Sequence, residues 1–194
     1  DLDLRQTGNA SRAEQGLPPT AFVFCNFANS SRITRKVFAL WMEILRALPS
    51  AVLWLRQSHA LTVRNLRSTA QRCGVDPVRL IFAPRVASKP AHLARVALAD
   101  LALDTIGWYN GHSSTSDMLW AGVPVLTAAG ETFASRVAAS LSHAAALPEL
   151  VAGDARDYVR QAVELGNDRA LCVSLKRKLA DNRSSSPFFN EKQF

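Results

Sequence analysis

Ala21-Phe-Val-Phe-Cys25 and Ala51-Val-Leu-Trp-Leu55 are two short apolar runs that decide the fold of this chain. Both are rich in aromatic and β-branched residues and both end at a polar side chain, which is typical of fully buried strands. Between them, apolar residues recur along one helical face, and Thr34 stands where that helix would be capped. The stripe over 35–48 consists of Val37, Leu40, Trp41, Ile44, Leu45 and Leu48. The stretch therefore predicts a strand, a helix and a second strand parallel to the first.

The same alternation continues toward the C-terminus. Further apolar runs predict strands over 78–83, 101–104 and 124–127, each followed by a helical pattern. Helices are expected over about 60–73, 89–98, from about 112, and over about 132–142, 154–166 and 168–180. This alternation indicates an α/β fold, a Rossmann-like doubly wound parallel sheet with helices on both faces. Residues 1–18 are interpreted as a linker, 19–182 as the folded lobe and 183–194 as a tail.

The composition is that of a globular protein of about one domain. The chain has 194 residues, of which 48% are hydrophobic and 20% charged, and its mean hydropathy is +0.00. These values exclude collagen, a disulfide scaffold and wholesale disorder. No apolar stretch is long enough to span a membrane, and the polar first residues are not those of a signal peptide.

The net charge of +7 comes from 23 Lys and Arg against 16 Asp and Glu. The cations are spread along the chain without a basic stripe interleaved with aromatic residues, so neither nucleic acid nor a membrane is an expected partner. Cys25, Cys73 and Cys172 lie far apart and form no CxxC pair. Free thiols in a reducing compartment and no metal site are therefore expected.

The loop after the predicted strand 101–104 carries the strongest signal for a ligand. Ligands of doubly wound sheets bind beyond the carboxyl ends of the strands, and there Asn110-Gly-His-Ser-Ser114 leads directly into a helix. The free amides of a helix N-terminus and two adjacent hydroxyls would hold a phosphate group. The alternative is that Ser113 or Ser114 only caps the helix.

Asp117 follows one turn later in the same helix. A carboxylate there can accept both ribose hydroxyls of a nucleotide, and the alternative is an acidic residue that favours the helix dipole. Neither GxGxxG nor GxxxxGK[ST] occurs in the chain. A sugar nucleotide therefore fits this loop better than a dinucleotide or ATP.

Several stretches, taken together and in order, resemble the protein O-GlcNAc transferase family. They are Val23-Phe-Cys-Asn-Phe27, Val52-Leu-Trp-Leu55, Leu98-Ala-Asp-Leu-Ala-Leu-Asp-Thr105, Asn110-Gly-His-Ser-Ser-Thr-Ser-Asp-Met-Leu-Trp-Ala-Gly-Val-Pro124, Gly130-Glu-Thr-Phe-Ala-Ser-Arg-Val-Ala-Ala-Ser140 and Ser185-Ser-Pro-Phe-Phe-Asn-Glu-Lys-Gln193. The resemblance covers residues 15–194 nearly without gaps.

The resemblance implies the second, donor-binding lobe of a GT-B glycosyltransferase. Such enzymes move N-acetylglucosamine from UDP-GlcNAc to Ser or Thr of intracellular proteins, with inversion at the anomeric carbon and without a metal or other cofactor. The expected partners are thus UDP-GlcNAc, acceptor proteins, a first catalytic lobe and tetratricopeptide repeats, and the expected location is the cytoplasm or nucleus. The family also has a closing helix after the segment that resembles 183–194.

The resemblance also assigns roles to individual residues. Arg32 matches the lysine that neutralises the departing diphosphate, and Asn29 stands where the family usually has Gln. The donor-binding positions are Asn29, Ala87, Lys89, His92, Arg95, His112, Ser113, Ser114 and Asp117. The uracil would be surrounded by Ala87, Lys89, His92 and Arg95. The diphosphate would be bound by His112, Ser113 and Ser114, and the ribose by Asp117.

Two departures from the family leave alternatives open. Arg keeps the charge of the lysine but presents a planar fork, and Arg56 stands where the family tends to be apolar. A non-catalytic nucleotide-sugar-binding fragment or pseudoenzyme is one alternative. A related protein O-fucosyltransferase lobe that uses GDP-fucose is the other.

Overall fold

The computed structural model describes residues 10–190 and shows the predicted alternation of strands and helices. The strands are β1 Val23–Asn26, β2 Val52–Arg56, β3 Leu80–Ala83, β4 Leu101–Leu103, β5 Val125–Ala128 and β6 Val151–Ala152. The helices are α1 Arg35–Ala47, α2 Ala60–Arg72, α3 Lys89–Val96, α4 Ser113–Trp120, α5 Val137–Ala144, α6 Ala155–Asn167 and α7 Arg169–Asp181.

The strands form one parallel sheet in the order β3-β2-β1-β4-β5-β6. This order confirms the predicted Rossmann-like doubly wound fold. The chain reverses its direction of winding between β1 and β4, where Phe24 lies opposite Leu101. The loops after these two strands consequently leave the sheet side by side, and a ligand site is expected between them.

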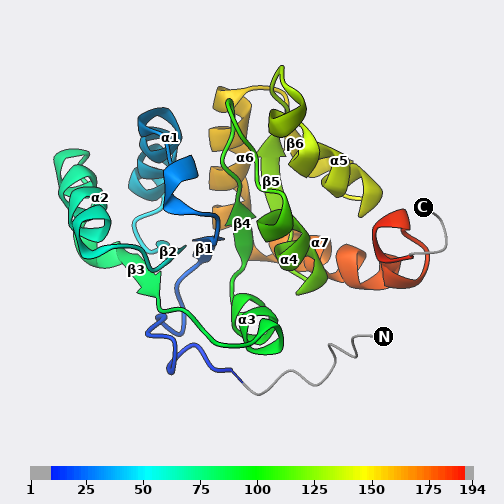
Figure 1. Ribbon diagram of the computed structural model, residues 1–194, viewed down its shortest axis with the longest axis horizontal. Helices are drawn as coiled ribbons and strands as arrows, with labels where there is room; N and C mark the ends of the chain where they lie inside the picture. The colour runs from blue at the N-terminus through cyan, green and yellow to red at the C-terminus, as the bar shows by residue number, and fades with distance from the viewer. Residues whose placement is uncertain (1–9, 191–194) are drawn as a thin grey trace.

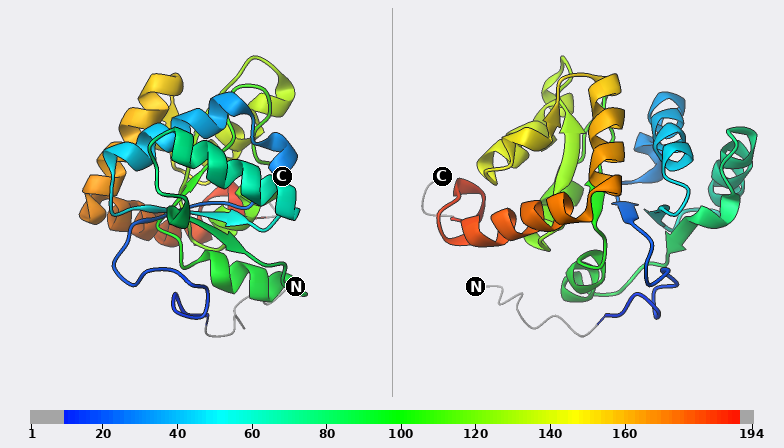
Figure 2. Two further views of the ribbon diagram at one scale, coloured as in Figure 1. Left: turned by 90° about the vertical axis from the view of Figure 1, so that its left-hand side faces the viewer. Right: turned by 180° about the vertical axis from the view of Figure 1, so that it is seen from behind.

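Helices cover both faces of the sheet (Figures 1 and 2). Helices α1 and α6 pack against each other on one face, and α3, α4 and α5 form a contiguous row on the other. Helix α2 lies at the outer end of the molecule, beside β3 (Figure 1). Helix α7 runs along the amino edge of the sheet, where the Cys172 thiol donates to Asp100 O at 3.3 Å.

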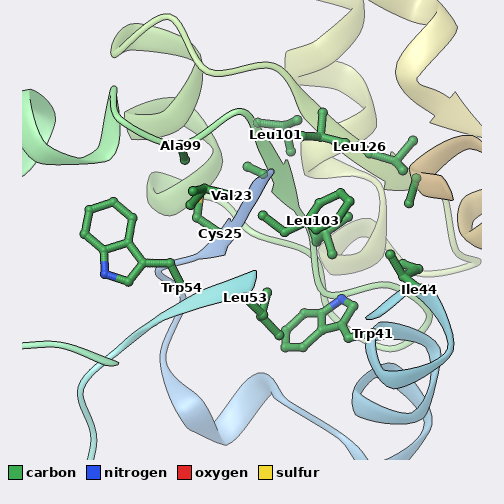
Figure 3. Packing of buried hydrophobic residues seen from close by; sticks show 14 of the residues in the cluster. Val23, Cys25, Trp41, Ile44, Leu53, Trp54, Ala99, Leu101, Leu103 and Leu126 are labelled. Atoms are coloured by element: carbon green, nitrogen blue, oxygen red, sulfur yellow. The ribbon is translucent and has the colours of Figure 1, made fainter. Parts of the chain in front are cut away.

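The core is formed by the apolar strands and the helix stripes that cover them (Figure 3). Trp41, Trp54 and Tyr158 are among its largest fully buried side chains. Trp41 Nε1 donates to Tyr158 Oη at 3.1 Å, and Tyr158 Oη donates to Asp104 O at 2.9 Å. This chain of hydrogen bonds ties α1 and α6 to the end of β4.

The cap predicted at Thr34 is confirmed, and two further helices are capped in the same way. Thr34, Asp154 and Asp168 each accept a hydrogen bond from a backbone amide in the first turn of α1, α6 and α7. The segment predicted as one helix over 132–142 differs, because a 3-10 turn over Phe133–Ser135 precedes α5. Strand β6 has two residues, too few for an alternation signal to predict it.

Residues 10–18 contact the amino edge of the sheet. Arg12 donates to Ala21 O at 2.9 Å and forms an ion pair with Asp100 at 2.9 Å. The predicted division into linker, lobe and tail stays a prediction, and its residues 1–9 and 191–194 lie outside the described part. All three cysteines are free thiols. Within residues 10–190, no helix has the length and apolarity needed to cross a membrane.

Candidate active site at the carboxyl edge of the sheet

The loop between β4 and α4 is anchored by a buried carboxylate, Asp104. Asp104 Oδ1 accepts from the amides of Thr105 at 2.8 Å and Gly111 at 2.6 Å. Asp104 Oδ2 accepts from Asn110 Nδ2 at 2.8 Å and from Thr127 Oγ1 at 2.7 Å. Burial raises the pKa of Asp104 above its ordinary value, and these four hydrogen bonds oppose that rise. The network holds both ends of the loop against the ends of β4 and β5.

Gly111 is the residue that permits this close approach. A Cβ at this position would lie 2.9 Å from Asp104 Oδ1, 2.9 Å from Ser114 Oγ and closer still to Thr115 Oγ1. Real side chains do not approach neighbouring atoms so closely, so only glycine fits between the carboxylate and the first turn of α4. Gly111 thereby fixes where α4 begins.

The first turn of α4 presents its amides toward the loop after β1. His112 is the N-cap residue and makes no side-chain hydrogen bond to the helix. Ser113 is exposed and Ser114 half-buried, and neither is the N-cap residue, so the interpretation of a serine that only caps the helix is wrong. The leading amides have no acceptor inside the helix and carry a partial positive charge, as an anion site requires.

Arg32 lies across from this helix start, in a short turn after β1. Its guanidinium stands over the Tyr109 ring at 4.1 Å from the centroid, and Nη1 donates to Asn110 O at 3.3 Å. The Tyr109 ring is stacked on His112, with centroids 4.6 Å apart and an interplanar angle of 23°. His112 Nε2 lies 3.1 Å from the carbonyl of Ala134, an acceptor, so this nitrogen carries the proton. Arg32, Tyr109 and His112 therefore form one stack beside the start of α4.

A second group of predicted residues meets between α3 and α4. Asp117 Oδ1 pairs with Lys89 Nζ, and Asp117 Oδ2 lies 3.6 Å from His92 Nε2. The Asp117 and His92 side chains are 17% and 19% exposed, and Lys89 is 52% exposed at the rim. Burial lowers the pKa of His92, Arg95 lowers it further, and Asp117 opposes the shift. His92 is consequently neutral at pH 7 and offers both a donor and an acceptor nitrogen.

Arg95 holds the loop before α3 in place. Its Nη1 donates to Pro84 O, and its guanidinium lies 5.2 Å from the centroid of the Phe27 ring. Phe27 also makes an edge contact with the His92 ring, centroid to centroid 5.4 Å. Burial lowers the pKa of Arg95, as does the charge of Arg56. Phe27, the residue after β1, thus packs against both His92 and Arg95 of α3.

The structure brings most of the sequence-predicted residues to this edge. Asn29 caps the turn that carries Arg32: its side chain accepts from Ser31 N at 3.1 Å and its carbonyl from Arg32 N at 2.9 Å. Ala87 is exposed in the loop before α3, and no described contact joins it to the other predicted residues. Their assigned roles toward a ligand stay predictions.

Three residues that matter here were missed by the sequence analysis: Asp104, Tyr109 and Phe27. Asp104 had a signal, because a carboxylate that directly follows a buried apolar strand must find hydrogen-bond partners at the sheet edge. Phe27 and Tyr109 had no comparable signal, since each acts through a ring contact with a residue distant in sequence or across a loop.

A doubly wound lobe with a helix N-terminus and a carboxylate at its topological switch point is typical of nucleotide-binding α/β proteins. The model of glycosyl transferase family 41 matches residues 5–194, and the chain therefore belongs to that family.

Relatives and solved structures agree with this assignment. The chain is 39% identical over 184 residues to a UDP-N-acetylglucosamine--peptide N-acetylglucosaminyltransferase of Caenorhabditis elegans, which covers 95% of the chain and 16% of the relative. An O-GlcNAc transferase mutant of Thermobaculum terrenum superposes with a TM-score of 0.81 at 31% identity, over 91% of the chain and 35% of that structure. The C-terminal domain of a group 1 glycosyl transferase (LpcC) from Francisella tularensis shares the fold, with a TM-score of 0.61 at 12% identity. The match covers 95% of this chain and 97% of that domain. The chain thus has the fold of a GT-B lobe and spans a minor part of its full-length relatives.

Proposed function

We propose that this chain is the donor-binding lobe of a glycosyltransferase that moves N-acetylglucosamine from UDP-GlcNAc to Ser or Thr of proteins. One observation carries the proposal. Asp117, Lys89 and His92 lie together one turn from the exposed amides of α4, and Arg32 faces the same helix start. A nucleoside diphosphate needs this combination of a ribose acceptor, a base-binding rim and a cationic phosphate site.

Each element has a distinct task in the proposed reaction. The amides of α4 and the hydroxyls of Ser113 and Ser114 bind the diphosphate, and Asp117 accepts the ribose hydroxyls. As the bond between the sugar and the β-phosphate breaks, negative charge grows on the diphosphate. Arg32, held in place by the Tyr109 ring, stabilises that charge more in the transition state than in the ground state.

The proposal includes partners outside this chain. With Arg32 and the α4 amides supplying positive charge, transfer is expected to proceed without a metal ion, which activity of the complete enzyme in EDTA would test. The acceptor hydroxyl belongs to a Ser or Thr of the acceptor protein. The residues around that hydroxyl are expected from a first lobe, and tetratricopeptide repeats would select acceptor proteins. The names of the relatives support the donor and the protein acceptor. The free thiols fit a reducing location such as the cytoplasm or nucleus.

Isothermal titration calorimetry with UDP and GDP tests the donor assignment. We expect UDP to bind and GDP to bind more weakly. Asp117→Ala should weaken UDP binding by about 1–3 kcal/mol, because charge-assisted hydrogen bonds to the ribose are lost. Asp181→Ala, which removes a carboxylate that is 71% exposed at the end of α7, is the matched control and should leave the affinity unchanged. Equal affinity for both nucleotides, or no binding of either, would contradict the assignment.

A further inference from the structure

The positive charge of the chain is concentrated in one part of the fold. Although cations occur throughout, residues 44–99 hold nine Lys and Arg and a single acidic residue, Asp76. Asp76 is engaged in its own turn, where Oδ1 accepts from Val78 N at 3.0 Å. This part of the sequence forms β2, α2, β3 and α3. Nine cations minus one acid give these residues a net charge of +8, whereas the rest of the chain is close to neutral with a net charge of −1.

Several of these cations are held by contacts within the fold. Arg79 donates to the carbonyls of Ala51, Leu45 and Leu48, and Lys89 pairs with Asp117. Arg64 and Arg67 are both exposed on α2, and within residues 10–190 neither takes part in an ion pair. The Arg67 guanidinium is positioned by the Phe82 ring, 5.3 Å from its centroid.

Arg64 and Arg67 lie in a groove of about 540 Å³ along α2. The groove is lined by Gln57, Ala60, Val63, Arg64, Arg67, Ser68, Gln71 and Pro77, and no carboxylate is among these residues. From Ala60 to Gln71 the helix rises about 16 Å, the length of roughly five residues of extended polypeptide. Helix α2 lies at the outer end of the lobe, beside β3 (Figure 1).

We propose that this groove binds an extended acidic segment of a partner polypeptide, with Asp or Glu at alternate positions. Residues three apart on a helix have Cβ atoms about 5–6 Å apart, and side chains on one side of an extended chain repeat about every 6.6 Å. Arg64 and Arg67 therefore match carboxylates at positions i and i+2. The amides of Gln57 and Gln71 offer both donors and acceptors to the peptide backbone.

The lining distinguishes this ligand from nucleic acid. Binding of single strands relies on aromatic platforms for base stacking, and none of the residues that line the groove is aromatic. Exposed Leu61 and Val78, next in sequence to lining residues, are 49% and 71% exposed and suit apolar side chains of a peptide. The groove also begins at Gln57, directly after β2, and Ser58 Oγ lies 2.8 Å from Ser30 Oγ in the turn that carries Arg32. A bound polypeptide thus leads toward the carboxyl edge of the sheet.

Fluorescence anisotropy with labelled peptides tests the proposal without any glycosyl transfer. The probe is Gly-Glu-Ala-Glu-Ala-Glu-Gly, with a peptide carrying Gln in place of Glu and an oligothymidylate as comparisons. Arg64→Gln combined with Arg67→Gln should weaken binding of the probe about tenfold, since two exposed charge pairs are lost. Arg156→Gln combined with Arg177→Gln removes the same charge from exposed sites on α6 and α7, and should change binding less than about twofold.

The outcomes separate this proposal from the proposed donor site. Unchanged melting temperature and UDP affinity in the α2 variant show that the lobe is intact, and selective loss of peptide binding then supports the groove. Equal weakening by both pairs of substitutions, no binding of the probe, or tighter binding of oligothymidylate at the same salt concentration would overturn it. If the chain bound the probe but not UDP, the result would support the proposed peptide groove and contradict the proposed donor site.

Discussion

Gly111→Ala is the substitution that most directly tests the anchored start of α4. The added Cβ would enter space held by Asp104 Oδ1, Ser114 Oγ and Thr115 Oγ1, at 2.9 Å or less from each. Overpacking of this kind costs about 1–3 kcal/mol. The displaced loop also stretches the 2.6 Å hydrogen bond from Gly111 N to the Asp104 carboxylate, a further loss of about 1.5–3 kcal/mol. The expected loss of unfolding free energy is therefore about 2.5–6 kcal/mol.

For a chain of this size, 1 kcal/mol shifts Tm by about 2–4 °C, so calorimetry should show a fall of roughly 5–24 °C. Gly153→Ala is the matched control, because the nearest neighbour of its Cβ would be Asp157 Oδ2 at 3.9 Å, and its Tm should change by less than about 2 °C. Below its melting range, Gly111→Ala should bind UDP at least about tenfold more weakly. A wild-type Tm would refute the packing argument, and wild-type UDP affinity in a destabilised variant would refute the role of α4 in binding the diphosphate.

Three further predictions concern the stack and the buried titratable groups. Tyr109→Leu should weaken UDP binding about threefold in calorimetry and Tyr109→Phe by less than about twofold, because the ring holds the Arg32 guanidinium. The effect of Tyr109→Leu should be smaller in an Arg32→Met background, where only the stacking of the ring on His112 is lost. An equal loss in both backgrounds would contradict the role of the ring in holding Arg32. Burial lowers the pKa of His92, so its contribution to stability is lost as the pH falls below 6.5, and urea unfolding between about pH 8 and 5.5 should show a steeper loss for wild type than for His92→Gln. Burial raises the pKa of Asp104 above its ordinary value of 3.8. Its contribution to the free energy of unfolding is therefore fully present below pH 3.8 and is lost as the pH rises through the pKa of the folded state. Asp104→Asn should abolish that decrease, and identical pH profiles for the variant and wild type would show that Asp104 does not titrate in this way.

The fold could be predicted because its determinants are local. The run that becomes β1 is apolar throughout and fully buried, and the stripe of α1 places Trp41 and Ile44 in the core. These patterns depend only on neighbouring residues, as do the caps at Thr34 and Asp154. A two-residue strand such as β6 has no pattern of its own, since its place in the sheet depends on the backbone of β5.

The candidate site could be predicted only to the level of loops. The rule that parallel strands present their carboxyl ends at one edge placed Arg32 and Asp117 in the same region. It could not place the Tyr109 ring between Arg32 and His112, because that depends on a loop whose turn contains Gly107 with a positive φ of 94°. The α2 groove was similarly hidden: the scarcity of acids over 44–99 is visible in the sequence, but the cavity beside Arg64 exists only after α2 packs at the end of the sheet.

The adjacency of β1 and β4 has a consequence for how the protein is made. Asn26 and Leu103, joined by a hydrogen bond of 2.7 Å, are separated by 77 positions in the chain. During synthesis, β1, β2 and β3 with their helices leave the ribosome before β4 exists, and until then β1 exposes an unpaired edge. Pairing over such a sequence separation requires closing a long loop and is slow. The pairing of β1 with β4, which forms the switch point and the site, is thus a late step of folding. A nascent chain stalled before Leu101 would present β1 as an unpaired edge strand and would be prone to associate with other chains through it.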